Sequence, residues 1–270
     1  MKNNESIIIS GPKLRCLTPV KTNNFTCNNL NSVDFLMENY LQQLIDGQNK
    51  DLWEYLNSKF EIILEESPED NYMTNVVGQK AIIRIDKLQV LPAPFTHELL
   101  HIQLKDKKLK IANDLFKKIA ESPNLTKLFS VALQEHIGNC LEHIIMLPVF
   151  LELGYDNKDF IKDYGERKMN NRLLTKLQSA FKHKHIYSRD AIDFYIGKFF
   201  AMKSCNNKNF KYDKYYEQLK KLDSQLFALL DNFWEDLLTF DINDAGDSYD
   251  EILNFFINDI TNWMRNKTIQ

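Results

Sequence analysis

The spacing of apolar residues in the first hundred positions predicts a mixture of helices and strands. Apolar residues recur every three to four positions between Ser32 and Gly47, which is the period of a helix with a cap at each end. Residues 72–86 are rich in β-branched side chains on both sides of a Gly-Gln-Lys turn and indicate a hairpin. The other elements expected here are a strand at 7–9, a loop at 16–31, a short helix at 51–58, a strand at 60–64 and an acidic loop at 65–71.

Beyond the hundredth residue the pattern is helical almost to the last position. The breaks between the helical segments are too short for a flexible linker, and no internal repeat is visible. We therefore expect an α+β, predominantly helical fold, with a small N-terminal β-sheet and a helical C-terminal body, in a single domain over 1–270. The helices predicted in this half lie at 109–120, 125–153, 157–182, 188–203, 211–239 and 248–265.

Composition and charge narrow the class of protein. The 270 residues include 44% hydrophobic and 26% charged side chains, as expected of a globular chain. The net charge of −3 provides no basic surface for a phosphate backbone, so we expect no nucleic acid partner. The chain has no apolar run of membrane-spanning length and no signal peptide pattern at residues 1–6, which favours the cytoplasm and no membrane association. The four cysteines form no Cys-x-x-Cys pair, so we expect reduced thiols.

One five-residue motif carries candidate chemistry. His97 and His101 are four positions apart, with Glu98 between them, and Pro92 and Pro94 precede them where a helix would begin. On a helix, residues at this spacing lie on one face, so both imidazoles can bind one metal ion while the carboxylate reaches a water beside it. The motif predicts a zinc site with Glu98 as the general base.

A catalytic zinc ion commonly takes a third protein ligand from another element. The predicted helix 125–153 carries the richest set of candidates. A helical wheel places His136 and His143 beside its apolar face and Glu135 and Glu142 nearly opposite. This geometry favours His143, whereas Glu142, His136 and Glu135 remain alternatives.

These residues together resemble the zincin metallopeptidases, including small intracellular gluzincin-like and ImmA/IrrE-like members. The resemblance covers the His97–His101 motif, the strands before it and the helix that carries His143. It implies a zincin-like catalytic region at 1–155, a helical extension at 156–270, a zinc cofactor and a peptide or protein substrate. It also implies that an edge strand within 72–86 binds the substrate backbone. The longer histidine run of metzincins is absent after His101.

The expected activity is zinc-dependent peptide hydrolysis, with an extra hydrogen-bond donor for the developing oxyanion from Tyr155, His136 or Asn139. The alternative is a helical interaction or regulatory protein that retains the zinc site without turnover. Two other patterns predict no site. Residues 241–252 lack the side chains that an EF-hand loop requires, and the two histidines of 182–185 diverge on a solvated turn.

Overall fold

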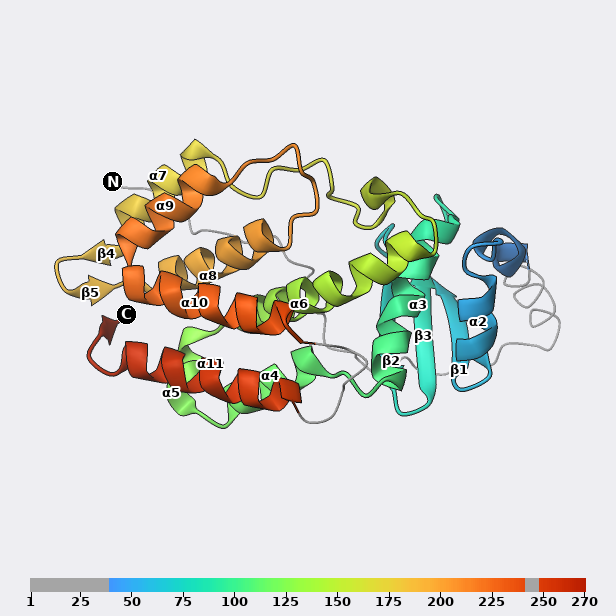
Figure 1. The fold of residues 1–270 in the computed structure, drawn as a ribbon, viewed down its shortest axis with the longest axis horizontal. Coiled ribbons are helices and arrows are strands. Elements are labelled where there is room, and N and C mark those ends of the chain that lie inside the picture. Colours follow the sequence, from blue (N-terminus) through green and yellow to red (C-terminus); the bar gives the residue numbers. More distant parts are fainter. Residues whose placement is uncertain (1–38, 241–247) are drawn as a thin grey trace, which may run out of the picture.

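The computed structural model describes residues 39–240 and 248–270 and has a sheet at one end and a body of helices at the other (Figure 1). The strand predicted at 7–9, the loop at 16–31 and residues 241–247 of the rejected EF-hand loop lie outside the described residues. The described chain is predominantly helical, and its fold is α+β as predicted. None of the helices in these two ranges is long and apolar enough to cross a membrane.

The sheet end is built from strands β1 (Glu61–Glu66), β2 (Met73–Val77) and β3 (Lys80–Ile85). Strand β3 is central, with β1 parallel on one side and β2 antiparallel on the other. Gly78 has a φ of +63°, which a β-branched or bulky residue rarely adopts, and it turns β2 into β3. Alternate residues of β3 are buried, as expected for a strand with one face against a core.

Two helices pack at this end of the molecule. Helix α2 (Lys50–Asn57) precedes the sheet, and α3 (Pro92–Asp106) follows it and packs against α2, β2 and β3. Residues 39–44 are also helical, in agreement with the part of the predicted helix 33–45 that is described. The hairpin, the strand before it and the helix that begins near Pro92 are thus confirmed.

The helical body contains eight helices among the described residues, and α6 is the longest and most central of them (Figure 1). Helix α6 crosses from the body to the sheet end, where it packs against α3. Gly138 lets α6 approach α4 closely, because a Cβ at this position would lie 2.5 Å from the Cβ of Ala112. The helices are α4 (Ile111–Ala120), α5 (Pro123–Leu128), α6 (Val131–Glu152), α7 (Asn171–Ala180), α8 (Arg189–Lys203), α9 (Asp213–Leu222), α10 (Ser224–Leu238) and α11 (Ser248–Met264).

Two clusters of buried apolar residues divide the interior. The sheet-end core contains residues of α2, α3, β3 and the C-terminal half of α6. The body core contains residues of the N-terminal half of α6 and of α4, α5, α7, α8, α9, α10 and α11. Partly buried Ile145 and Tyr249 contact both clusters. Helix α6 therefore connects the two cores as one continuous rod, and the division expected at residue 155 stays a prediction.

The predicted boundaries of three long helices are wrong. The segment 125–153 is two helices, because Phe129 is extended and the Ser130 side chain caps α6 by accepting from the amide of Leu133. The segment 211–239 is likewise broken at Asp223, whose side chain caps α10. In both cases a capping residue within a continuous apolar pattern starts a new helix.

The predicted helix 157–182 is mostly irregular before α7. A short 3₁₀ turn (Asn157–Asp159, labelled η1) and a series of turns lead to Asn170, which caps α7. Phe160 and Met169 supply part of the helix-like spacing, but in the structure they are buried anchors of a loop, one in each core. Apolar spacing alone does not separate such anchors from a helix face.

A second small sheet was not predicted. Strands β4 (Lys182–His183) and β5 (Ile186–Tyr187) form a hairpin, and β6 (Thr268–Ile269) pairs with β5 in parallel. The turn at 182–185 is exposed, as expected, and does not bring its two histidines into a metal group among the described residues.

Candidate metal centre

Helix α3 presents the motif to the interior of the sheet end. The backbone runs continuously through His97 and His101, so the two imidazoles lie on one face, with ring centroids 5.0 Å apart. His97 is 9% exposed and Glu98 is 6% exposed. The motif therefore lies in the interior of the protein and not on a solvated face of the helix. Nearly the whole first part of α3 is buried because α2, the sheet and α6 surround it.

A third histidine reaches the motif from α6. The imidazole of His143 packs against that of His97 with ring centroids 4.8 Å apart. One ligand atom from each of His97, His101 and His143 can be chosen so that all three lie within 4.8 Å of one another. This is the sole group of three or more histidine, cysteine or acidic residues with such spacing in 39–240 and 248–270. The structure thus brings together the three residues that the sequence favoured as ligands.

Glu142 lies beside this cluster and contacts one of its histidines. Its Oε2 is 2.9 Å from Nδ1 of His101, and its Oε1 is 3.4 Å from Nζ of Lys105. A carboxylate at the Nδ1 of a histidine fixes the tautomer of the ring, so Nε2 of His101 is left as the lone-pair donor when Nδ1 donates to Glu142. Glu142 was an alternative ligand in the sequence, and the structure instead places it against His101.

The buried positions shift the protonation of the three histidines in different directions. Burial, followed by the charge of the nearby His101, lowers the pKa of His143 to about 3. Burial, followed by the charges of His143 and His101, also lowers the pKa of His97. For His101 burial acts in the same direction, but the hydrogen bond to Glu142 and nearby carboxylates outweigh it and raise the pKa. Two of the three rings are therefore neutral near pH 7, the form that binds a metal.

Glu98 is buried next to the cluster with few polar neighbours. Burial raises the pKa of its carboxyl group above the usual value, while His101 and Thr74 act in the opposite direction. The hydroxyl of Thr74, on β2, donates to the backbone carbonyl of Glu98 at 3.4 Å. A carboxylate with a raised pKa is a stronger base than an exposed glutamate, which suits proton transfer.

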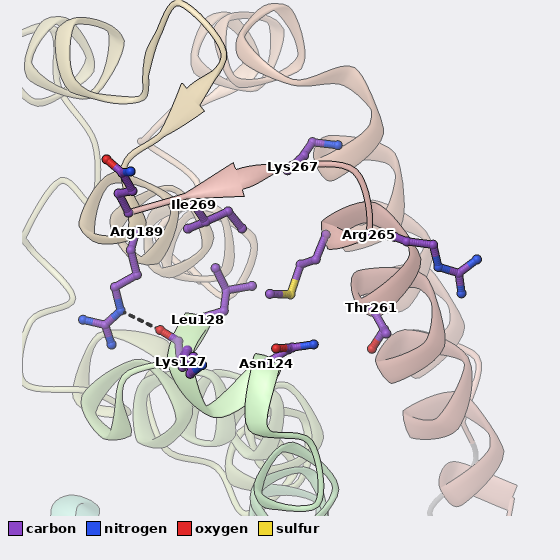
Figure 2. A pocket seen from close by; sticks show the side chains of 10 residues that line it. Asn124, Lys127, Leu128, Arg189, Thr261, Arg265, Lys267 and Ile269 are labelled. Carbon is purple, nitrogen blue, oxygen red and sulfur yellow. Dashed lines mark hydrogen bonds between the residues drawn. The ribbon is translucent and has the colours of Figure 1, made fainter.

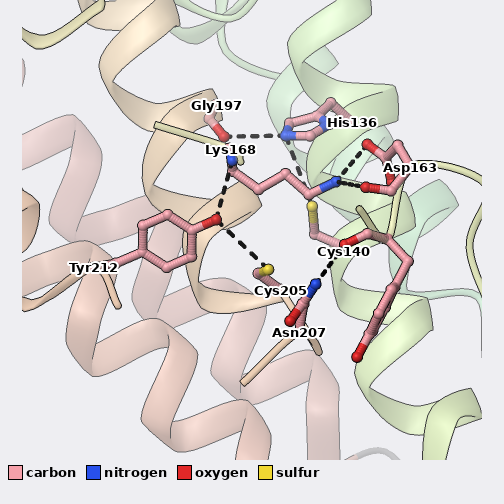
Figure 3. A network of polar contacts seen from close by, with 9 residues as sticks. His136, Cys140, Asp163, Lys168, Gly197, Cys205, Asn207 and Tyr212 are labelled. Carbon is pink, nitrogen blue, oxygen red and sulfur yellow. Dashed lines mark hydrogen bonds and ion pairs between the residues drawn. The ribbon is translucent and has the colours of Figure 1, made fainter. Parts of the chain in front are cut away.

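Phe160 covers the cluster from the irregular segment after α6. Its ring centroid is 4.7 Å from that of His97 and 5.4 Å from that of His143, and the residue is 4% exposed. Hydrogen bonds fasten both ends of this segment to the residues between α8 and α9. Asn157 and Asn206 exchange side-chain and backbone hydrogen bonds. The backbone amide of Lys168 donates to the hydroxyl of Tyr212 at 3.0 Å (Figure 3).

The remaining candidates from the sequence lie elsewhere. His136 faces α8, where its Nε2 is 3.0 Å from the carbonyl oxygen of Gly197 and 3.7 Å from the sulfur of Cys140 (Figure 3). Glu135 and Asn139 are exposed on α6. The structure therefore does not bring these three residues into the histidine cluster.

Tyr155, considered as an oxyanion donor, supports the start of α3. Its hydroxyl donates to Oδ1 of Asp46 at 2.8 Å and contacts the hydroxyl of Thr96, which also accepts from Asn49. Burial raises the pKa of Tyr155, followed by the hydrogen bond to Asp46. Its hydroxyl hydrogen is thus already engaged in a network that joins α3 to the residues before α2.

The donor set fits a zinc ion. Three imidazoles are a known ligand set for catalytic zinc, which leaves one position for water. Nδ1 of His97 is buried and has no hydrogen-bond partner among the described residues, so part of the cluster is unsatisfied without a further group. The spacing of up to 4.8 Å between the three ligand atoms is larger than the roughly 3.4 Å between nitrogens around a tetrahedral zinc.

Sequence reasoning missed three residues around the cluster. Phe160, Lys105 and Thr74 come from a loop, from the end of α3 and from β2, and each contacts a motif residue or Glu142. Lys105 lies four positions after His101, one helical turn along the same face. That spacing is the one signal in the sequence that could have indicated it.

In comparisons with known proteins, no family model, no curated protein and no solved structure matches the chain.

Proposed function

We propose that the chain is a zinc-dependent metallopeptidase with a zincin-like catalytic region. The observation that carries the proposal is the meeting of His97 and His101 on α3 with His143 on α6, with ligand atoms within 4.8 Å. The buried Glu98 next to His97 supplies the base that such a reaction needs. The small sheet beside α3 agrees with the arrangement that the resemblance to zincins implies.

In this proposal His97, His101 and His143 hold the ion. A zinc ion bound there lowers the pKa of a coordinated water to about 7 and polarises the carbonyl of the scissile peptide bond. Glu98 accepts the proton that the water loses as its oxygen attacks the carbonyl carbon. Glu98 then delivers this proton to the amide nitrogen when the C–N bond breaks. Glu142 holds the ring of His101 in one orientation throughout.

The substrate is a peptide or protein segment, and β2 is the candidate for its binding edge. Within the described part of the chain, strand β2 pairs with β3 alone, and it packs against α3. The unpaired backbone groups of an edge strand can pair with an extended peptide. Thr74 of β2 contacts the Glu98 carbonyl, so a peptide added at this edge runs close to the motif.

The test combines metal analysis with one conservative substitution. Purified protein is expected to contain about one zinc ion per chain, and zinc-loaded protein to cleave members of a random peptide library followed by mass spectrometry. Glu98→Gln removes the base and is expected to retain zinc while the cleavage rate falls by about 10²- to 10⁴-fold. Glu135→Gln changes an exposed glutamate of α6 and serves as the matched control.

Absence of zinc from the purified protein, together with failure to take it up, contradicts the proposal. So does a Glu98→Gln variant that cleaves the same peptides at the wild-type rate.

One observation favours a second function, that of a regulatory or interaction protein that holds zinc without turnover. His97 and Glu98 are buried and Phe160 covers two of the three imidazoles, so the approach to the cluster is restricted. Zinc at one equivalent without cleavage of any library peptide supports this second function over the first.

A further inference from the structure

A cavity lies away from the histidine cluster, at the end of the body where α5, the start of α8, the end of α11 and β6 meet (Figures 1 and 2). Its volume is about 630 Å³. Pockets of roughly 300–1,000 Å³ are the usual size for small organic ligands. The cavity is therefore large enough for a molecule rather than for a few waters.

The lining combines an apolar surface with a basic rim. Leu128, Met264 and Ile269 supply apolar side chains from three different elements. Around them stand four cationic residues, and the lining includes no aspartate or glutamate. The four are Lys127, Arg189, Arg265 and Lys267.

This concentration of positive charge runs against the balance of the whole chain. The chain carries a net charge of −3, with 37 acidic and 34 basic residues, so a cavity whose charged side chains are all cationic differs from its average surface. Lys127 and Arg265 form no ion pair with any residue in the described ranges. Arg189 pairs at 3.3 Å with the exposed Asp190, outside the lining, and such surface pairs are weak.

Two of the four cationic side chains donate hydrogen bonds to backbone carbonyls. Nε of Arg189 donates to the carbonyl of Lys127 at 3.0 Å, which links α8 to α5 on one side of the cavity (Figure 2). Nζ of Lys267 donates to the carbonyl of Trp263 at 2.9 Å. Lys267 forms no ion pair within the described ranges, and Arg189 has only its weak surface pair with Asp190, so an anion can approach either side chain.

We propose that this cavity binds a small organic anion, with its apolar body on Leu128, Met264 and Ile269 and its phosphate or carboxylate group on the basic rim. The inference does not depend on the zinc site, because the cavity shares no residue with α3 or with the histidine cluster. The apolar surface selects for the body of the ligand and the rim selects for its charge. A ligand that has one part without the other binds less tightly.

Isothermal titration with three probes separates the two contributions. Hexyl phosphate carries both parts, inorganic phosphate carries the charge alone, and 1-hexanol carries the apolar body alone. Hexyl phosphate is expected to bind at least about tenfold more tightly than either of the others, since one charge-assisted hydrogen bond contributes about that factor or more. Its affinity is also expected to fall as salt is raised.

Substitutions locate the site. Lys127→Gln and Arg189→Gln are each expected to weaken hexyl phosphate binding by about tenfold. The matched control is Arg172→Gln, on the exposed surface of α7 outside the lining, which is expected to leave the affinity unchanged. Circular dichroism and thermal unfolding verify that each variant is folded, and Lys127→Gln removes no hydrogen bond that its side chain makes to a described residue.

Three outcomes overturn the proposal: no detectable binding of hexyl phosphate at millimolar concentration, equal binding of 1-hexanol, or wild-type affinity in the folded Lys127→Gln and Arg189→Gln variants. Because zinc content and peptide cleavage are not measured in this experiment, its failure leaves the proposed zinc function as it stands.

Discussion

The two cores of the molecule bury polar groups for different reasons. In the helical body, the buried acids serve the fold. Asp223 caps α10 by accepting from the amide of Leu226 at 2.8 Å, and it also accepts from the indole of Trp263 at 3.2 Å. Asp193 accepts from the amide of Ser130 at the start of α6. Each carboxylate thus satisfies a helix end or a buried donor.

In the sheet-end core, two buried ionisable residues of the motif have no such structural role. Among the described residues His97 has no hydrogen-bond partner for its Nδ1, and the Glu98 side chain caps no helix. Burying groups of this kind costs free energy without a local return, and such groups concentrate at functional sites. The proposed chemistry thus belongs to the sheet end, whereas the buried acids of the body support the fold, and α6 connects the two cores.

Truncation of one aromatic residue in each core gives the largest expected effect on stability. Phe256 is 2% exposed and stacks on Phe233 with ring centroids 4.1 Å apart. Phe256→Ala is expected to lower the free energy of unfolding by about 3–5 kcal/mol, measured by urea denaturation, while zinc affinity stays unchanged. Phe160→Ala is expected to cause a similar loss and also to change zinc affinity. Equal effects of both variants on zinc binding would show that the two cores are not separable.

Removal of one proposed zinc ligand is expected to weaken zinc binding strongly. Structural zinc sites contribute about 10–16 kcal/mol from four ligands, so removal of one ligand weakens binding by roughly 10²- to 10³-fold. His143→Gln is expected to show this loss in a titration against a competing chelator. His136→Gln alters a histidine of the same helix that faces α8 and is expected to bind zinc as the wild type does. Wild-type affinity in His143→Gln would remove α6 from the site.

Glu142→Gln is expected to have a smaller effect of the same kind. The amide retains a hydrogen-bond acceptor for His101 but loses the charge that fixes its ring, and such partners change metal affinity by about 10- to 100-fold. The same chelator titration measures it, with Glu135→Gln as the exposed control. A loss as large as that of His143→Gln would indicate that Glu142 is itself a ligand.

The smallest predicted effect is a pH dependence of stability in metal-free protein. The pKa of His143 falls from 6.5 to about 3 on folding, so the unfolded chain binds the extra proton between these values. The stability contribution of His143 is therefore complete above pH 6.5 and is lost as the pH falls toward 3. The raised pKa of His101 acts in the opposite direction, with stability lost as the pH rises through its folded value.

The effect is measured by urea denaturation at several pH values between 4 and 7 after treatment with a chelator. The free energy of unfolding of His143→Gln is expected to depend less steeply on pH than that of the wild type, by at most about 1.4 kcal/mol per pH unit. Parallel pH profiles for the two proteins would mean that His143 is not buried as a neutral ring.

The sequence was sufficient for elements whose signals are local. The period of the apolar residues and the turn at Gly78 predicted the hairpin, and the prolines at 92 and 94 predicted where α3 begins. The spacing of His97 and His101 placed both on one face of that helix because a helix has a fixed period. Caps at Ser130, Asn170 and Asp223 broke three predicted helices, since a side-chain hydrogen bond to a backbone amide leaves no mark on apolar periodicity.

By itself the sequence determined the motif, the helix that carries it, and a preference for His143 as its partner. Only the tertiary structure decided that His143 meets the motif, that Glu142 contacts His101, and that Phe160 covers the rings. The helical wheel assumed one buried face, but α6 is buried on different faces by α3 and by the body helices, so Glu142 is buried as well. Contacts between α3 and α6 depend on how two helices cross, and no periodicity within either helix encodes that crossing.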